Sequence, residues 1–284
     1  MDETSLTVED ARTALRQAQV TCVHDLAIES HGRSLPLRLY TPPGKGPFPV
    51  LVFFHGGGWV TGDLDTHDGF CRFMCEWAGC AVVAVDFARP PEHLFPAALE
   101  DCWTAFKWVT RQGAGCGLDT SSIAVAGGGS GGGMAAVISQ RDAECDEPCI
   151  CFQLLLYPLL DCNTRRSSHT RFGQGHGLTV DLLEWYLGHY LPPGTSRVDR
   201  RLSPLLSDSL HGLPRTLIIT CGLDVLRDEG RAYAKRLRAA NVTVEHKEFS
   251  GMRHGFMNYP AAHEEARRAL LLCARTLQAQ LRGE

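Results

Sequence analysis

The chain has 284 residues, 44% of them hydrophobic, and a formal net charge of -4 at pH 7. This length can bury a large core as a single domain. No basic run is long enough to bind a phosphate backbone, so we expect no nucleic-acid partner. No apolar run approaches 18 residues, and the polar N-terminus does not resemble a secretory signal. We therefore expect a cytoplasmic protein with no membrane span.

The chain has twelve cysteines. Disulfide scaffolds are typical of short secreted chains with little core, so we expect reduced thiols here. Cys145, Cys149 and Cys151 lie close together in the sequence, but a zinc site needs paired spacings with a second cluster or histidines. The sequence therefore predicts structural thiols and no bound metal.

Two stretches that alternate polar and apolar residues, 22–29 and 34–40, predict an antiparallel strand pair at the start of the chain. Beyond them, short runs that are apolar on both faces alternate with amphipathic helical patterns. This alternation is typical of an α/β fold with a mostly parallel sheet covered by helices on both sides. The further strands are predicted at 50–54, 81–87, 122–127, 150–157, 215–222 and 242–249, and the helices at 67–78, 96–111, 131–141, 226–240 and 261–281.

Two features of this element order extend the prediction. Nearly sixty residues separate the strand at 150–157 from the strand at 215–222, too many for a simple connection, so we expect an inserted cap. The cap contains a helical pattern at 178–191. The last strand, 242–249, is expected at or near a sheet edge, where open backbone groups invite pairing with a second copy as a homodimer.

The stretch "SSIAVAGGGSGGGMAAVISQ" at 121–140 sets six glycines around Ser130. An interdomain linker is excluded because the glycines lie between a buried strand and a helix of one alternating series. The spacing of Gly127, Gly129 and Gly132 also matches a dinucleotide-binding loop. That match is weak alone, because the next strand ends in "LLLYP" without the acidic residue that holds a ribose. A dinucleotide-binding protein remains an alternative that only the glycine spacing favours.

A third interpretation is the nucleophile elbow G-x-S-x-G, met by residues 128–132 with Ser130 as the nucleophile. A catalytic serine needs a histidine base, an acid to orient that base, and N–H donors for an oxyanion. In the expected chain order, Asp224 follows one strand end and His254 follows another. Asp228 is an alternative acid, but it lies a full turn into a helix.

These motifs resemble the hormone-sensitive-lipase-like branch of the α/β-hydrolases, a family of bacterial carboxylesterases. The motifs are "HGGGW" at 55–59, "VVAVDFARPPEHLFPAALED", the glycine-rich turn, "YPLLD", "GLDVLRDEG" and "HGF". The resemblance implies an α/β-hydrolase fold over residues 1–284, a cap formed by about 1–20 and about 162–211, a small-molecule ester as substrate, and no cofactor. It also implies that the oxyanion donors are the N–H groups of Gly56, Gly57 and Gly131, the last being the residue after the nucleophile.

The serine stands one place later than the family pattern G-D-S-A-G-G-N requires. Laid without gaps on this chain, that pattern puts Gly129 at the nucleophile position. Either the turn has slipped by one residue, which the flexible glycines would allow, or the nucleophile is missing. We expect a slipped turn, and hence an enzyme that cleaves short-chain carboxylic esters through Ser130, His254, Asp224 and an acyl-enzyme. The alternative is a catalytically impaired ligand-binding protein of the same fold.

Overall fold

A computed structural model describes residues 22–283. Its central sheet has eight strands in the order β1-β2-β4-β3-β5-β6-β7-β8. β1 pairs with β2, and β2 with β4, in antiparallel fashion, whereas all other neighbours are parallel. The strands are β1 (Cys22–Ser30), β2 (Arg33–Thr41), β3 (Phe48–Phe54), β4 (Ala81–Val85), β5 (Leu118–Gly128), β6 (Ile150–Leu156), β7 (Arg215–Leu223) and β8 (Val244–Arg253).

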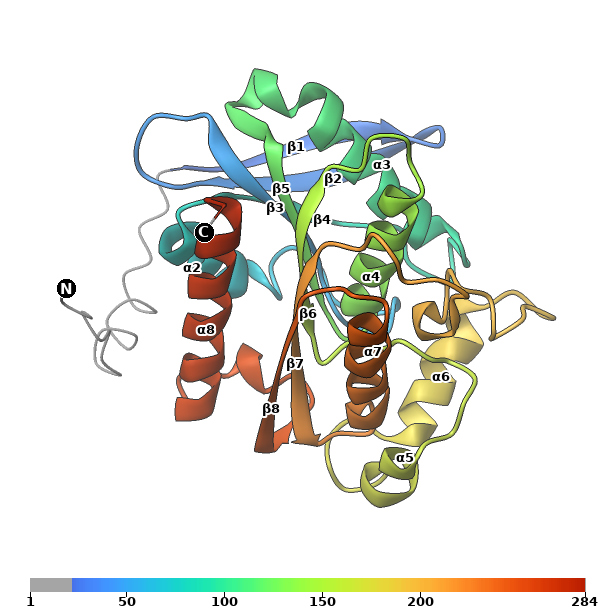
Figure 1. Ribbon diagram of the computed structural model, residues 1–284. Coiled ribbons are helices and arrows are strands. Elements are labelled where there is room, and N and C mark those ends of the chain that lie inside the picture. The colour runs from blue at the N-terminus through green and yellow to red at the C-terminus, as the bar shows by residue number, and fades with distance from the viewer. Residues whose placement is uncertain (1–21, 284) are drawn as a thin grey trace.

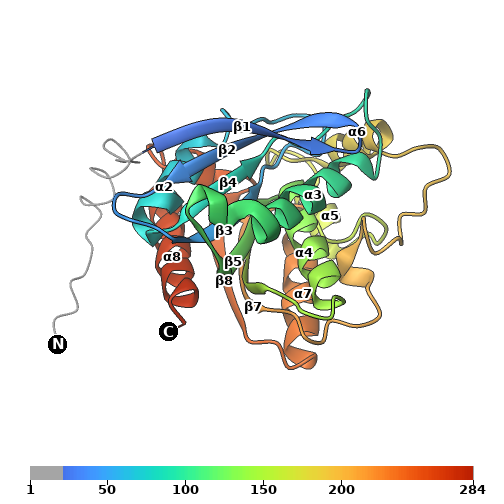
Figure 2. The same cartoon turned by 90° about the horizontal axis from the view of Figure 1, so that it is seen from above.

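Helices cover both faces of this sheet (Figure 1). α2 (Asp68–Ala78) packs against α8 (Glu264–Leu281) on one face. α3 (Ala97–Gln112), α4 (Ser130–Ala143) and α7 (Arg227–Ala239) cover the other face, as Figure 2 shows from above. The predicted mostly parallel α/β architecture is therefore confirmed.

The central strands are buried on both sides, which explains why they are apolar throughout. Along β3, Val50, Val52 and Phe54 join the core under α3 and α4. The alternate residues, Leu51 and Phe53, join the core under α2 and α8. Because successive strand residues point to opposite faces, a strand between two helix layers needs apolar side chains at every position.

The long connection between β6 and β7 carries two helices, α5 (Ser167–Phe172) and α6 (Val180–Tyr190), and a short 3-10 turn at Pro204–Leu206. The Thr179 side chain caps α6 by accepting a hydrogen bond from the Leu182 N–H. This insert is the part of the predicted cap that the structure describes, since residues 1–20 lie outside the described range. No helix between residues 22 and 283 is both long enough and apolar enough to cross a membrane.

The parallel strands β3, β5, β6 and β7 all end at the same edge of the sheet. The loops that follow them carry "HGGGW", the glycine-rich turn, the insert and Asp224. This is the edge at which open α/β sheets bind ligands. β8 is an outermost strand, as the sequence predicts.

Candidate active site

A one-residue turn connects β5 to α4, and Gly129 is that residue. Its backbone angles are φ 55° and ψ -118°, a conformation that side chains rarely adopt. The turn is held from both sides, because the Gly129 N–H donates to Leu156 O at 3.0 Å and the Gly129 carbonyl accepts from Leu159 N at 2.9 Å. Gly129 therefore stands where a nucleophile elbow holds its serine.

Ser130 is the first residue of α4 and lies one position beyond the apex. It is 4% exposed, and its Oγ accepts a hydrogen bond from the Trp59 N–H at 3.3 Å. Within residues 22–283 it forms no hydrogen bond with His254. The prediction that the turn has slipped, with Ser130 at its apex, is therefore wrong.

The packing of α4 explains why the turn has not slipped. The helix lies so close to its neighbours that a Cβ on Gly131 would come within 2.1 Å of Phe54 O, and one on Gly133 within 2.2 Å of Leu159 O. A slip of one residue would move Met134 into the place of Gly133. Because backbone atoms cannot yield to that Cβ, the glycines hold the unslipped register.

His254 and Asp224 meet beside this turn, although they come from loops after different strands. The Asp224 side chain is 1% exposed, and its Oδ2 lies 2.8 Å from His254 Nδ1. Asp224 Oδ1 also accepts from the Leu226 N–H at 3.0 Å, which fixes the carboxylate. A neutral His254 thus carries its proton on Nδ1 and leaves Nε2 as an acceptor.

The free nitrogen of His254 faces the apex of the turn. A Cβ built on Gly129 would lie 3.2 Å from His254 Nε2. The histidine and the acid therefore have the arrangement of a catalytic dyad, and the position where a nucleophilic side chain would start holds only a glycine hydrogen. Asp228, the alternative acid, instead accepts from the Ser168 N–H and pairs with Arg227.

The loop "HGGGW" after β3 brings backbone donors to the same place. Gly57 has φ 118°, and a Cβ there would lie 2.1 Å from Thr61 O, so the loop requires glycine at this position. Within the described residues, the N–H groups of Gly56 and Gly57 donate no hydrogen bond. With Gly129 at the apex, the residue after it is Ser130 rather than Gly131, so the third predicted donor moves to the Ser130 N–H. Gly131 serves the close packing described above.

These groups line a cavity of about 360 Å³ at the carboxyl edge of the sheet. The insert closes one side of it with Leu178, Leu183 and Tyr186. The Tyr186 ring lies against the glycine loop, where a Cβ on Gly58 would come within 2.3 Å of the ring. The cavity wall is thus mostly apolar, as is usual for small-molecule sites.

His67 also lines this cavity. The Thr66 hydroxyl donates to Asp63 O at 2.8 Å, so its contact of 3.1 Å with His67 Nδ1 requires the histidine to donate. His67 Nε2 is then an acceptor, 4.0 Å from a Cβ position on Gly56. Burial lowers the pKa of His67, which favours this neutral form.

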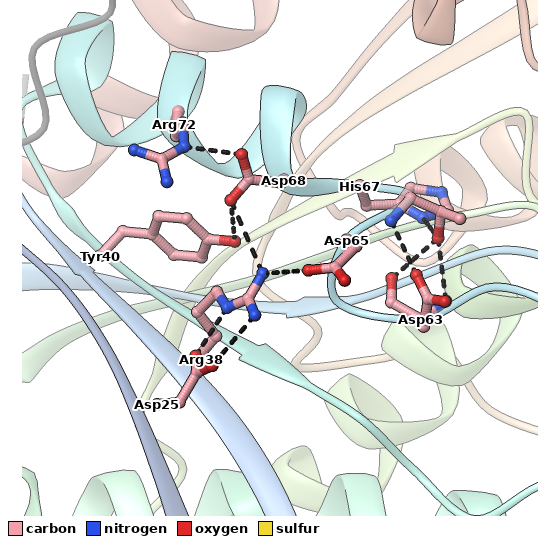
Figure 3. A network of polar contacts seen from close by, with 9 residues as sticks. Asp25, Arg38, Tyr40, Asp63, Asp65, His67, Asp68 and Arg72 are labelled. Carbon is pink, nitrogen blue, oxygen red and sulfur yellow. Dashed lines mark hydrogen bonds and ion pairs between the residues drawn. The ribbon is translucent and has the colours of Figure 1, made fainter.

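A polar network anchors the loop that carries His67 to strand β2 (Figure 3). Arg38 of β2 donates to Asp25 and Asp65, while Asp68 accepts from the Tyr40 hydroxyl at 3.0 Å. Asp25 and Asp65 are exposed, so these ion pairs contribute little stability by themselves. They join Asp65, two residues before His67, to Arg38 of β2.

His55, the first residue of the glycine loop, has a structural role. Its Nδ1 lies 2.8 Å from Gly56 O, and its ring stacks on Phe87 with centroids 4.1 Å apart. Burial lowers the pKa of His55 to about 4. The ring is therefore neutral near pH 7 and donates its Nδ1 proton to the loop backbone.

Comparison with known proteins agrees with the fold. Residues 51–258 match a protein family described as having the alpha/beta hydrolase fold. The chain is 43% identical over 242 residues to carboxylic ester hydrolase LipN of Mycobacterium tuberculosis, an alignment that covers 83% of this chain and 64% of LipN. The chain belongs to the α/β-hydrolase family. It falls in the hormone-sensitive-lipase-like branch that the motifs indicate.

Other relatives of this α/β-hydrolase are named as esterases. Ethyl acetate hydrolase of Pseudomonas putida is 35% identical, and the alignment covers 92% of this chain and 83% of that enzyme. The crystal structure of EstE1, a thermostable carboxylesterase cloned from a metagenomic library, superposes with a TM-score of 0.91 at 36% identity, covering 96% of this chain and 94% of EstE1. Its relatives identify the protein as a hydrolase of the carboxylesterase type.

Sequence reasoning missed several residues of this site. His67 stands in a polar loop rather than at a strand end, and only its neighbours in "GDLDTHDG" could have drawn attention to it. The contact of Tyr186 with the glycine loop depends on how the insert folds back, which no local pattern specifies. Trp59 donates its N–H to Ser130 Oγ from a backbone with a positive φ of 64°, a conformation that the sequence does not indicate for a tryptophan.

Proposed function

We propose that this α/β-hydrolase cleaves short-chain carboxylic esters by direct attack of water, with His254 as general base and no acyl-enzyme. One observation carries the proposal: His254 Nε2, activated by Asp224, faces the empty side-chain position of Gly129 at 3.2 Å. Replacing a serine side chain by glycine leaves room for a water in hydrogen-bond reach of the base. Water, rather than Ser130, is then the nucleophile.

In this mechanism His254 Nε2 takes a proton from the water as its oxygen attacks the carbonyl carbon of the ester. The resulting oxyanion accepts hydrogen bonds from the N–H groups of Gly56, Gly57 and Ser130. His254 then returns the proton to the leaving alkoxide as the carbon–oxygen bond breaks, giving acid and alcohol. Asp224 orients the imidazole and stabilises its charged form.

The rate expected from such a site is modest. Enzymes of this class that lose a triad member keep about 10³–10⁴-fold catalysis over water from the oxyanion donors and substrate binding. The cavity of about 360 Å³ is near the lower end for small-molecule sites, which favours short acyl chains. The insert at 162–211 acts as the cap that sets this limit, because it supplies Tyr186 and two leucines to the wall.

The glycine at the apex also favours a second function. A protein that keeps the cavity, the donors and the dyad but lacks a nucleophile can bind an ester or a related ligand without converting it. This binding role predicts saturable binding of butyrate esters with turnover no faster than the solution reaction.

Steady-state and burst kinetics with p-nitrophenyl butyrate test the proposal. We expect turnover above background without an initial burst of nitrophenolate, since no acyl-enzyme accumulates. His254→Ala should lower turnover by at least about 10²-fold, the contribution expected of a general base, and EDTA should leave wild-type turnover unchanged. An initial burst, or unchanged turnover in His254→Ala, would refute the mechanism, while binding without turnover would favour the second function.

A further inference from the structure

A second cavity of about 480 Å³ adjoins the first one. Thr66, His67 and Asn258 line both cavities and so form the wall between them. The second cavity lies near the start of α8, the helix that packs beside α2 in Figure 1. Its other lining residues are apolar with the exception of one cation: Gly69, Phe70, Met257, Pro260, Ala261, Leu270 and Arg267.

Arg267 is the unusual member of this wall. It is only 7% exposed, its Nη1 donates to Pro260 O at 2.5 Å, and its Nε is buried without a hydrogen-bond partner. Between residues 22 and 283 no carboxylate pairs with it. The acidic residues of the same helix turn, Glu264 and Glu265, bond to Arg268 instead.

A buried guanidinium without an anion is costly. Arginine does not lose its proton in proteins, so the charge cannot be removed by a pKa shift. Position in the first turn of α8 adds the repulsion of the positive helix end. With no anionic partner among residues 22–283, the buried charge destabilises this part of the free protein, and an anionic ligand would remove the penalty.

We propose that the second cavity is a carboxylate subsite anchored by Arg267. The planar guanidinium matches a carboxylate, and one positive charge balances one carboxylate, whereas a phosphate dianion would leave excess negative charge in an apolar cavity. The ligand is then an ester that extends from the first cavity past His67 and carries a carboxylate in the second cavity, such as a half-ester of a dicarboxylic acid. The ester part of this assignment rests on the proposed function, but carboxylate binding at Arg267 does not.

Calorimetric titration with two ketones that cannot be hydrolysed tests the subsite. 5-Oxohexanoate carries a carboxylate where 2-hexanone has a methyl group, and the rest of the chain is the same. Charge-assisted hydrogen bonds predict that the wild type binds 5-oxohexanoate at least about ten-fold more tightly than 2-hexanone. Equal affinity of the wild type for both ketones would overturn the proposal without bearing on hydrolysis.

Two variants assign the effect to Arg267. Arg267→Met should bind both ketones equally, and Arg267→Lys should keep part of the preference, since it retains the charge but not the planar fork. Without ligand, Arg267→Met should melt at the same or a higher temperature than the wild type, because it removes a buried charge that no carboxylate of the described residues pairs with. A preference that survives in Arg267→Met, or a lower melting temperature of that variant, would contradict the assignment.

Discussion

Placing a serine at the apex of the turn should convert this protein into a faster esterase. In Gly129→Ser with Ser130→Ala, the new Cβ would lie 3.2 Å from His254 Nε2, so the ring must move by a few tenths of an ångström. The hydroxyl then comes within reach of the base and the oxyanion donors. Because a complete triad exceeds the residual catalysis of a site without its nucleophile by orders of magnitude, we expect kcat to rise by at least about 100-fold.

The same change should lower stability. A side chain at φ 55° and ψ -118° costs about 1–3 kcal/mol of backbone strain. For a chain of this size, that corresponds to a fall in Tm of roughly 2–10 °C. The assays are p-nitrophenyl butyrate hydrolysis and thermal unfolding, with Ser130→Ala alone as matched control. No gain in the double variant, or loss of wild-type turnover in Ser130→Ala, would refute the placement of Gly129 at the apex.

Three further predictions concern packing, pH and assembly. Gly131→Ala should lower the free energy of unfolding by about 1–3 kcal/mol, because its Cβ would meet Phe54 O at 2.1 Å. The control Gly188→Ala, in open space on α6, should raise the free energy of unfolding by about 0.5–1 kcal/mol. Equal effects of the two variants in urea unfolding would contradict the close packing at Gly131. The pKa of His55 is lowered from 6.5 to about 4, so the unfolded chain binds this proton first and stability falls as pH drops from 6.5 towards 4. This contribution amounts to about 2 kcal/mol at pH 5 relative to pH 7, and it should vanish in His55→Asn; an unchanged pH dependence in that variant would exclude His55 as its source. The open edge of β8 (Val244–Arg253) predicts a homodimer, so light scattering at micromolar concentration should give twice the chain mass, and a monomer would count against it.

The sheet and its helices could be predicted from the sequence because the pattern is carried locally. The run "VLVFF" is apolar at each position, and β3 contacts a helix layer on both faces, so burial and pattern agree. The dyad could also be anticipated, since Asp224 and His254 each follow a strand end. The distance of 2.8 Å between Asp224 Oδ2 and His254 Nδ1 could be obtained only from the folded structure.

The register of the glycine turn could not be predicted from the sequence. Six glycines give the backbone freedom that allows either register, so local preference does not decide between Gly129 and Ser130. The decision comes from tertiary packing, through the contact of Gly133 with Leu159 O. Arg267 was missed for a similar reason, because a basic residue in an amphipathic helix normally faces solvent, and only the packed structure shows it to be buried.

The most direct test of the account is mass spectrometry of the intact protein after incubation with a fluorophosphonate probe, which forms a covalent bond with an activated serine. With Gly129 at the apex, the wild type should show no adduct, and Gly129→Ser should gain one adduct that maps to residue 129. A stoichiometric adduct on Ser130 of the wild type would contradict the account, because it would show that His254 activates that serine.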